Sequence, residues 1–253
     1  MREKLGEECG VLGVVLKTDE ATGVTYNVLL SLQNRGQEGA GIAVLKNSSI
    51  LHHKNTGFVG EVFSDKTLEH LPSDRLAIGH VRYSTTGANC MENVQPVVTA
   101  YLRGRIAAAH NGNIVNAIEI KKKLQADGCD FAATNDSEII SSLIAYEALS
   151  GCTMEDAVVR AARRLKGAFS IVVLSSKNKL LAFRDPWGFR PLCIGKSEHG
   201  VAVASESCAL DSAGFRFIRD IDPGELVIVN KEGEITSYKL AVTAKGRGNK
   251  IAV

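Results

Sequence analysis

Short apolar segments occur in two blocks along the chain, and the helices between these blocks constrain the fold more than any other feature. The segments have the length of strands and are joined by turn residues, as in residues 41–45 and 50–53, which flank a polar turn. The other expected strands are residues 76–81, 105–109, 169–174, 180–183, 201–204, 226–229 and 235–238. Strands and helices do not alternate regularly, as they would around a parallel sheet. The order predicts an α+β fold with mostly antiparallel sheets and layers of helices.

Four helical segments carry start or stop signals. Residues 22–34 and 114–126 have apolar side chains at helical spacing, and a glycine follows each segment within two residues. Asn135 and Thr153 each stand three residues before an acidic residue, the pattern of a capped helix start ahead of an apolar stripe. We therefore expect one helix early in the chain and three between the two blocks of strands.

The charge balance excludes several classes of partner. Thirty Lys and Arg residues against 28 Asp and Glu leave a net charge of +2, so no global field attracts nucleic acid or an anionic membrane. The longest apolar runs are far too short to span a bilayer. Residues 1–8 mix both charges and lack the apolar stretch of a secretory signal. We therefore predict a cytoplasmic protein without a nucleic-acid or membrane partner.

The cysteines do not have the spacing of a metal site. There are six, and no pair shows C-x-x-C or zinc-ligand spacing. In a reducing compartment we expect free thiols, most of them behaving as small buried apolar side chains. The sequence therefore predicts no bound metal.

Polar residues gather in short motifs at strand ends and in loops. Each motif has a structural explanation: Cys9 as a buried thiol, Arg82 in a surface ion pair, Asn111 with Gly112 as a tight turn, and Asp136 as a helix cap. Taken singly, these explanations stay open. Their combination points to chemistry, because catalytic residues concentrate in such places.

Five motifs occur together in the order and approximate spacing of the glutaminase domain of class II glutamine amidotransferases, which this sequence resembles. They are CGVLG at 9–13, NRGQEG at 34–39, GHVRYST at 79–85, HNGN at 110–113 and NDSE at 135–138. Later runs are similar to those of the amidophosphoribosyltransferases within that family, namely RDPWGFRPL at 184–192, ASES at 204–207 and DPGE at 222–225. The resemblance covers nearly the whole chain.

The resemblance implies an N-terminal-nucleophile hydrolase fold, a four-layer αββα sandwich of two antiparallel sheets between helical layers. It also implies hydrolysis of glutamine to glutamate and ammonia through a cysteinyl thioester. An amide is unreactive, so this chemistry needs a nucleophile, a proton shuttle and an oxyanion site. In the complete enzymes the ammonia serves to form phosphoribosylamine from phosphoribosyl pyrophosphate in de novo purine synthesis.

The same resemblance assigns roles to individual residues. Cys9 is the expected nucleophile, and Asn111 with Gly112 is the expected oxyanion site. Arg82 is expected to bind the α-carboxylate of glutamine through its planar fork, and Asp136 the α-ammonium.

Three more residues are expected near the substrate. Thr85 is expected to assist binding, and Arg35 with Gly36 belongs to a loop near the glutamine.

The expected proton shuttle is the α-amine of Cys9, whose ordinary pKa of about 7.7–8.0 suits it to exchange protons near neutral pH. Cys9 is not the first residue, so this amine is free only after residues 1–8 are removed. We therefore expect a propeptide at 1–8 and a glutaminase domain at 9–240. Residues 241–253 form a tail where the phosphoribosyltransferase domain would begin, and that domain is absent.

We expect no cofactor in this chain, although full-length relatives use Mg²⁺ and some carry a 4Fe–4S cluster. The expected partners are glutamine, the missing phosphoribosyltransferase domain and further copies of the full-length chain in a homo-oligomer. Two alternatives stay open. One is a catalytically silent or regulatory glutamine-binding domain, and the other is the glutaminase of another class II amidotransferase.

Overall fold

The computed structural model describes residues 8–83, 90–132, 136–240 and 249–251. These residues form two antiparallel sheets of seven strands each. Every strand pair within the two sheets is antiparallel, as the sequence predicts.

The first sheet has the strand order β11-β9-β10-β1-β4-β2-β3, so it combines the first four strands with three strands from residues 193–220. Its strand bounds are β1 Gly10–Leu16, β2 Gly39–Lys46, β3 Ser49–Thr56, β4 Leu76–Arg82, β9 Cys193–Ser197, β10 Gly200–Ala204 and β11 Arg216–Asp220. β1 and β4 are central neighbours, with Gly10 opposite Val81. The strand order therefore brings the residue before β1 next to the end of β4.

The second sheet has the order β14-β13-β12-β8-β7-β6-β5. Its strand bounds are β5 Val97–Tyr101, β6 Gly104–Ile114, β7 Gly167–Ser175, β8 Lys179–Arg184, β12 Glu225–Asn230, β13 Ile235–Lys239 and β14 Asn249–Ile251. β6 is the longest strand of the two sheets and pairs with β7 along nine positions.

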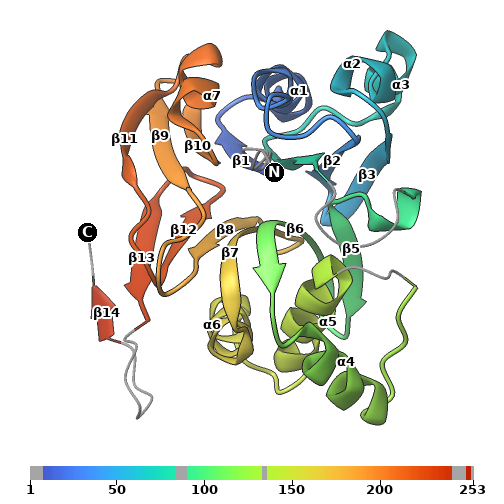
Figure 1. The fold of residues 1–253 in the computed structure, drawn as a ribbon. Coiled ribbons are helices and arrows are strands. Elements are labelled where there is room, and N and C mark those ends of the chain that lie inside the picture. Colours follow the sequence, from blue (N-terminus) through green and yellow to red (C-terminus); the bar gives the residue numbers. More distant parts are fainter. Residues whose placement is uncertain (1–7, 84–89, 133–135, 241–248, 252–253) are drawn as a thin grey trace, which may run out of the picture.

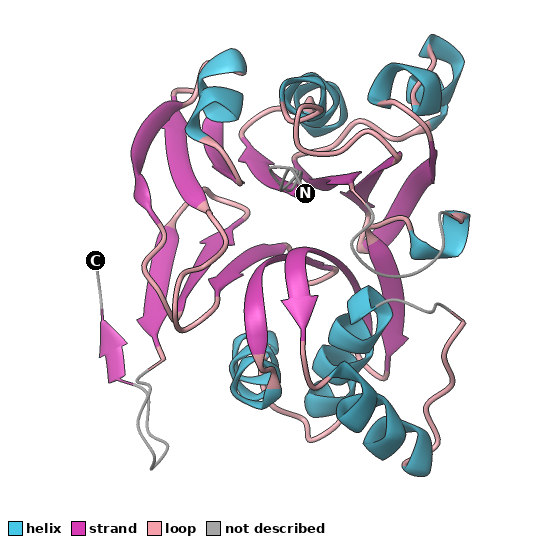
Figure 2. Ribbon diagram, viewed as in Figure 1, coloured by secondary structure: helices cyan, strands magenta, loops and turns pink. Residues whose placement is uncertain are grey.

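Helices cover the outer face of each sheet (Figure 1). Above the first sheet lie α1 Ala21–Ser31, α2 Val59–Val62, α3 Asp65–His70 and α7 Ser207–Ser212, and below the second lie α4 Ala117–Ala126, α5 Asp136–Ala148 and α6 Met154–Arg164. A short 3-10 helix, η1, spans Met91–Asn93. Figure 2 shows the strands in the middle of the molecule and the helices outside. The four-layer αββα fold expected from the resemblance is confirmed.

Alternating residues of one strand serve two different cores. In β1, Leu12 and Val14 pack with the helices outside the first sheet, whereas Val11 and Val15 pack between the two sheets. Burial of both faces explains why this strand is apolar throughout. Each fully buried Val or Leu contributes about 1.5–3 kcal/mol relative to an exposed one.

Several local predictions are confirmed or refined. Thr153 caps α6, with its Oγ1 accepting from the N–H of Asp156 at 3.2 Å. The predicted hairpin is β2 with β3, but its turn is shorter than expected. Asn47 and Ser48 have φ values of 50° and 62°, the left-handed conformation of a tight two-residue turn.

One boundary is wrong. The sequence predicts a helix over 114–126, whereas β6 continues through Ile114 and α4 begins at Ala117. Pairing with β7, for example Asn111 opposite Ser170, keeps the HNGN motif in the sheet. The tight turn considered for Asn111 is therefore wrong too. The capped start predicted at Asn135 lies outside the described residues.

The sequence patterns did not indicate the strand β1 or the shorter elements. The shorter elements are β5, β9, β11, β14, η1, α2, α3 and α7, none longer than six residues. In the described part of the chain, no helix has both the length and the apolar character to cross a bilayer.

Two adjacent leucines of α1 test the packing of the outer layer. Leu29 is fully buried against the first sheet, and Leu30 is 42% exposed. We expect Leu29→Ala to lower the free energy of unfolding by about 2–5 kcal/mol. Leu30→Ala is the matched control, because it makes the same change in helix propensity, and it should cost less than about 0.5 kcal/mol. Urea unfolding measures both, and equal losses would contradict the layer assignment.

Candidate active site

Cys9 stands directly before β1 and contacts the residue that follows β4. Its Sγ lies 3.3 Å from the carbonyl oxygen of Tyr83 and 3.4 Å from the Tyr83 nitrogen, whose N–H donates to the sulfur. Burial raises the pKa of the thiol, and the negative charge of Asp136 acts in the same direction. The Tyr83 hydrogen bond and the charges of Arg82 and Arg35 oppose that rise. The thiol therefore lies among several charged groups.

Arg82 is the last residue of β4, and its side chain is buried. Its main chain passes against Gly36, where an added Cβ would lie 2.6 Å from the Arg82 carbonyl carbon. The N–H of Glu38 donates to the Arg82 carbonyl at 3.0 Å. Gly36 thus permits the close approach that fixes the end of β4. Thr85, predicted nearby, lies outside the described residues.

Arg35 binds the main chain of the expected nucleophile. Its Nε donates to the Cys9 carbonyl at 3.0 Å, and its Nη1 donates to Glu206 at 2.7 Å. Its Nη2 lies 3.3 Å from a carboxylate oxygen of Glu8. The Arg35 guanidinium therefore contacts both Cys9 and Glu8, the residue that precedes it.

Asn111 and Gly112 come from β6 of the second sheet. The Asn111 Nδ2 is buried and has no hydrogen-bond partner among the described residues. A buried donor without a partner costs about 1–3 kcal/mol, so this amide is poised to donate to an incoming oxygen. Gly112 has a φ of +134°, and a Cβ there would lie 2.0 Å from the Ala168 carbonyl oxygen. Only glycine fits this position.

Asp136 is the first residue of α5 and is buried. Its Oδ2 accepts from the Ile114 N–H at 2.9 Å, and its Oδ1 lies 3.2 Å from Nε2 of His110. Burial raises the pKa of this carboxyl, but the His110 charge and the hydrogen bonds from His110 and Ile114 outweigh it and leave the pKa below its usual value. Asp136 is therefore held as a carboxylate.

The structure brings three of the predicted residues close to Cys9. The negative charge of Asp136 raises the pKa of the Cys9 thiol, and the charges of Arg82, at the end of β4, and Arg35, in the turn after α1, lower it. The arrangement offers a thiol, a buried amide donor, a buried carboxylate and a buried guanidinium.

A family model for the glutamine amidotransferase domain matches residues 80–212, which is more than half of the chain. The chain belongs to this glutamine amidotransferase domain family. Several residues of the candidate site, namely Arg82, Asn111, Gly112 and Asp136, lie inside the matched range.

Solved structures of the amidotransferase family have the same fold. Glutamine phosphoribosylpyrophosphate amidotransferase from B. subtilis, complexed with ADP and GMP, is 38% identical, with a TM-score of 0.84 over 93% of this chain and 50% of that chain. A structure described as the allosteric regulatory enzyme of purine biosynthesis is 35% identical, with a TM-score of 0.85 over 96% of this chain and 54% of that chain.

The curated relatives are amidophosphoribosyltransferases, and this chain spans about half their length. The Methanocaldococcus jannaschii enzyme is 42% identical over 234 residues, which cover 92% of this chain and 49% of the relative.

The sequence indicates no role for His110, which contacts Asp136 in this amidotransferase domain, or for Gln95 and His80, which lie beside His110. The His110 N–H donates to Oε1 of Gln95 at 2.7 Å, and Nε2 of Gln95 donates back to the His110 carbonyl at 3.3 Å. His80 is fully buried, and burial with the charges of His110 and Arg82 holds its pKa well below the usual value. His110 and His80 stand in the quoted motifs, but nothing in the sequence signals Gln95.

Gly112 offers a stability test that does not depend on activity. We expect Gly112→Ala to lower the free energy of unfolding by more than about 1 kcal/mol, because alanine there is strained and clashes with the Ala168 carbonyl. Gly60→Ala in α2 is the matched control, since an added Cβ at Gly60 meets nothing within 4 Å. It should be neutral or stabilising. A neutral Gly112→Ala in thermal or urea unfolding would refute the assigned backbone conformation.

Proposed function

We propose that this chain is the glutaminase half of an amidophosphoribosyltransferase and hydrolyses glutamine to glutamate and ammonia. The observation that carries the proposal is the grouping of the Cys9 thiol with Arg82 and Asp136, together with an Asn111 amide on β6 that has no hydrogen-bond partner among the described residues. Acyl transfer from an amide requires these functions: a nucleophile, an oxyanion donor and groups that bind the two charges of an amino acid.

In the proposed mechanism, the Cys9 sulfur attacks the side-chain amide carbon of glutamine. The α-amine of Cys9 takes the thiol proton and passes it to the departing ammonia. The Asn111 amide and the Gly112 N–H stabilise the oxyanion, and loss of one such donor typically costs about 3 kcal/mol of transition-state stabilisation. Water then hydrolyses the thioester to glutamate and restores the thiol.

The charged ends of glutamine fit two buried groups. We propose that the Arg82 fork binds the α-carboxylate and that Asp136 binds the α-ammonium. A carboxylate has about four lone-pair sites. Among the described residues, the Ile114 N–H donates to Oδ2 and Nε2 of His110 lies 3.2 Å from Oδ1, so we propose that Asp136 retains acceptor capacity for the α-ammonium.

The other residues predicted near the substrate have different proposed roles. Thr85 remains a proposed contact. For Arg35 and Gly36, the contacts with Cys9 and Arg82 support a role in holding the site together.

The proposed active form begins at Cys9. While Glu8 is attached, the Cys9 nitrogen is an amide and cannot accept a proton at neutral pH. Removal of the propeptide, residues 1–8, therefore precedes activity in this proposal, and residues 9–240 make up the glutaminase domain.

The complete enzyme is proposed to use the ammonia to form phosphoribosylamine in purine synthesis in the cytoplasm. The names and length of the relatives, of which this chain covers about half, support this reaction. We assign phosphoribosyl pyrophosphate, Mg²⁺, any 4Fe–4S cluster and homo-oligomer formation to the full-length protein with its transferase domain.

Replacement of Cys9 tests the nucleophile. We expect Cys9→Ala to abolish glutamate release and labelling by diazo-oxo-norleucine, an electrophilic glutamine analogue, while thermal unfolding stays cooperative. Cys208→Ala is the control, since Cys208 is exposed and should be dispensable. Peptide mapping of the label to any cysteine other than Cys9 would refute the proposed role.

Replacement of Arg82 tests substrate recognition. Arg82→Lys should raise the KM for glutamine roughly tenfold or more, because an ammonium cannot reproduce a bidentate charge-assisted pair. Arg219→Lys is the matched control. Arg219, on β11, also forms a bidentate pair, because its two Nη atoms donate to the Glu225 carboxylate, and its replacement should leave the KM for glutamine unchanged. Asp136→Asn should also raise KM. Steady-state kinetics in which all three variants behave alike would contradict these contacts.

A further inference from the structure

The run at 184–192 forms a braced loop, and the proposed glutaminase mechanism gives it no role. Arg184 uses three nitrogens to hold it, donating to the carbonyls of Arg190 at 2.8 Å, Ile221 at 2.7 Å and Gly188 at 2.7 Å. These three bonds from a charged donor fix the main chain at Gly188 and Arg190 and tie the loop to the residue that follows β11.

A buried carboxylate braces the same loop from inside. Asp185 is fully buried, and its oxygens accept from the N–H groups of Trp187 at 2.8 Å, Phe189 at 3.0 Å and Phe169 at 3.2 Å. The Phe169 bond ties the loop to β7. The loop is therefore a rigid support, and the residue it carries toward Cys9 is Arg190.

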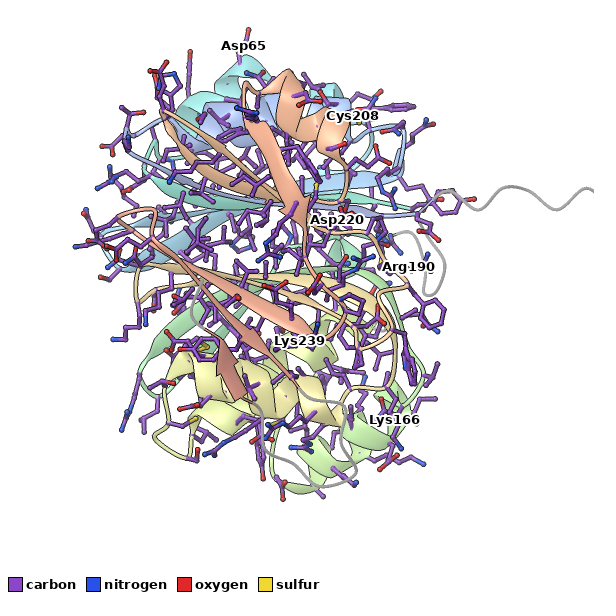
Figure 3. All side chains as sticks on the ribbon, turned by 90° about the vertical axis from the view of Figure 1, so that its left-hand side faces the viewer. Asp65, Lys166, Arg190, Cys208, Asp220 and Lys239 are labelled. Carbon is purple, nitrogen blue, oxygen red and sulfur yellow. The ribbon has the colours of Figure 1, made fainter. Side chains whose placement is uncertain are left out.

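Arg190 reaches the residue that precedes the nucleophile. Its Nη1 forms an ion pair with Oε1 of Glu8, and Nη2 of Arg35 lies 3.3 Å from the other carboxylate oxygen. Figure 3 places Arg190 at the level between the two sheets. The Glu8 carboxylate is thus held by two guanidinium groups from distant parts of the chain.

Arg190 depends on Glu8 more than Arg35 does. Glu8 is the only acidic partner of Arg190 among the described residues, whereas Arg35 also binds Glu206. The Arg190 side chain is 22% exposed, and its buried Nε has no hydrogen-bond partner within the described part of the chain. A guanidinium placed there without Glu8 lacks the charge that compensates its burial.

We infer that Arg190 and Arg35 form a recognition site for the acidic side chain before Cys9, and that they position the Glu8–Cys9 bond for cleavage. This inference rests on the proposed function, in which the leader is removed. Cleavage is a hydrolysis: one water is consumed, the C–N bond breaks, and Glu8 gains a carboxylate while Cys9 gains its α-amine.

The contacts lie on both sides of the bond that breaks. Arg35 binds the Cys9 carbonyl on one side and the Glu8 side chain on the other, and Arg190 fixes the Glu8 carboxylate. The peptide unit is therefore immobilised at both flanks, which favours a reactive geometry. Arg190 acts as a positioning residue for maturation and has no part in glutamine hydrolysis.

The test measures leader removal by intact mass over time after a pulse of expression of the full chain. We expect Glu8→Gln and Arg190→Gln each to slow the loss of residues 1–8 roughly tenfold, the factor that corresponds to about 1.4 kcal/mol. The double variant should be no slower than Glu8→Gln alone, because Glu8→Gln already removes the contact with Arg190. Arg164→Gln, which breaks the Arg164–Glu147 pair on the helices below the second sheet, is the matched control and should mature normally.

A second form of the chain separates maturation from folding and catalysis. With Met placed directly before Cys9, methionine aminopeptidase frees the amine without leader cleavage. In this form Arg190→Gln should release glutamate at the unaltered rate. Normal maturation of both single variants, a double variant slower than Glu8→Gln, loss of glutaminase activity caused by Arg190→Gln in an otherwise active Met-Cys9 form, or a wild-type chain that keeps residues 1–8 would each overturn the inference. An inactive wild-type Met-Cys9 form would instead refute the proposed function.

Discussion

Close packing of the two sheets is the constraint on which the site depends. Small side chains such as Ala43, Ala107 and Ala182 line the interface, and Gly13 leaves room for Leu180, whose Cδ1 would lie 2.5 Å from an added Cβ. Because the sheets approach closely, the ends of β4 and β6 deliver their polar residues to one place. The buried carboxylate of Asp136 and the thiol of Cys9 can then influence each other, although they belong to different halves of the sandwich.

Local sequence signals predicted elements whose own residues determine them. Thr153 caps α6 through a contact three residues away, and the hairpin of β2 and β3 closes through its own turn. The end of β6 could not be predicted in this way. It remains a strand because it pairs with β7, more than fifty residues later, and this pairing overrides the helical pattern that begins at Ile114.

The site likewise contains residues that the local sequence predicts and residues whose roles depend on tertiary contacts. The motifs predicted which residues gather around Cys9, since each stands in a quoted run. They did not predict the function of Arg35, because its contacts with Glu206 and Glu8 exist only when α7 and the N-terminal segment pack beside it. Gln95 could not be predicted for a similar reason. Its two hydrogen bonds to the main chain of His110 form only in the folded chain.

The charges around Cys9 link the maturation step to the proposed mechanism. In the precursor, the cations Arg35, Arg82 and Arg190 stand against Glu8, Asp136 and Glu206, a balanced set whose contacts include both sheets and the loop after β8. Departure of Glu8 removes one negative charge and creates an amine close to Arg35 and Arg82, the two cations that act on Cys9. Nearby positive charge disfavours a protonated amine and so lowers its pKa. An unprotonated amine is the form that can take the thiol proton, so Arg35, which contacts the leader through Glu8, also favours the base that leader removal creates.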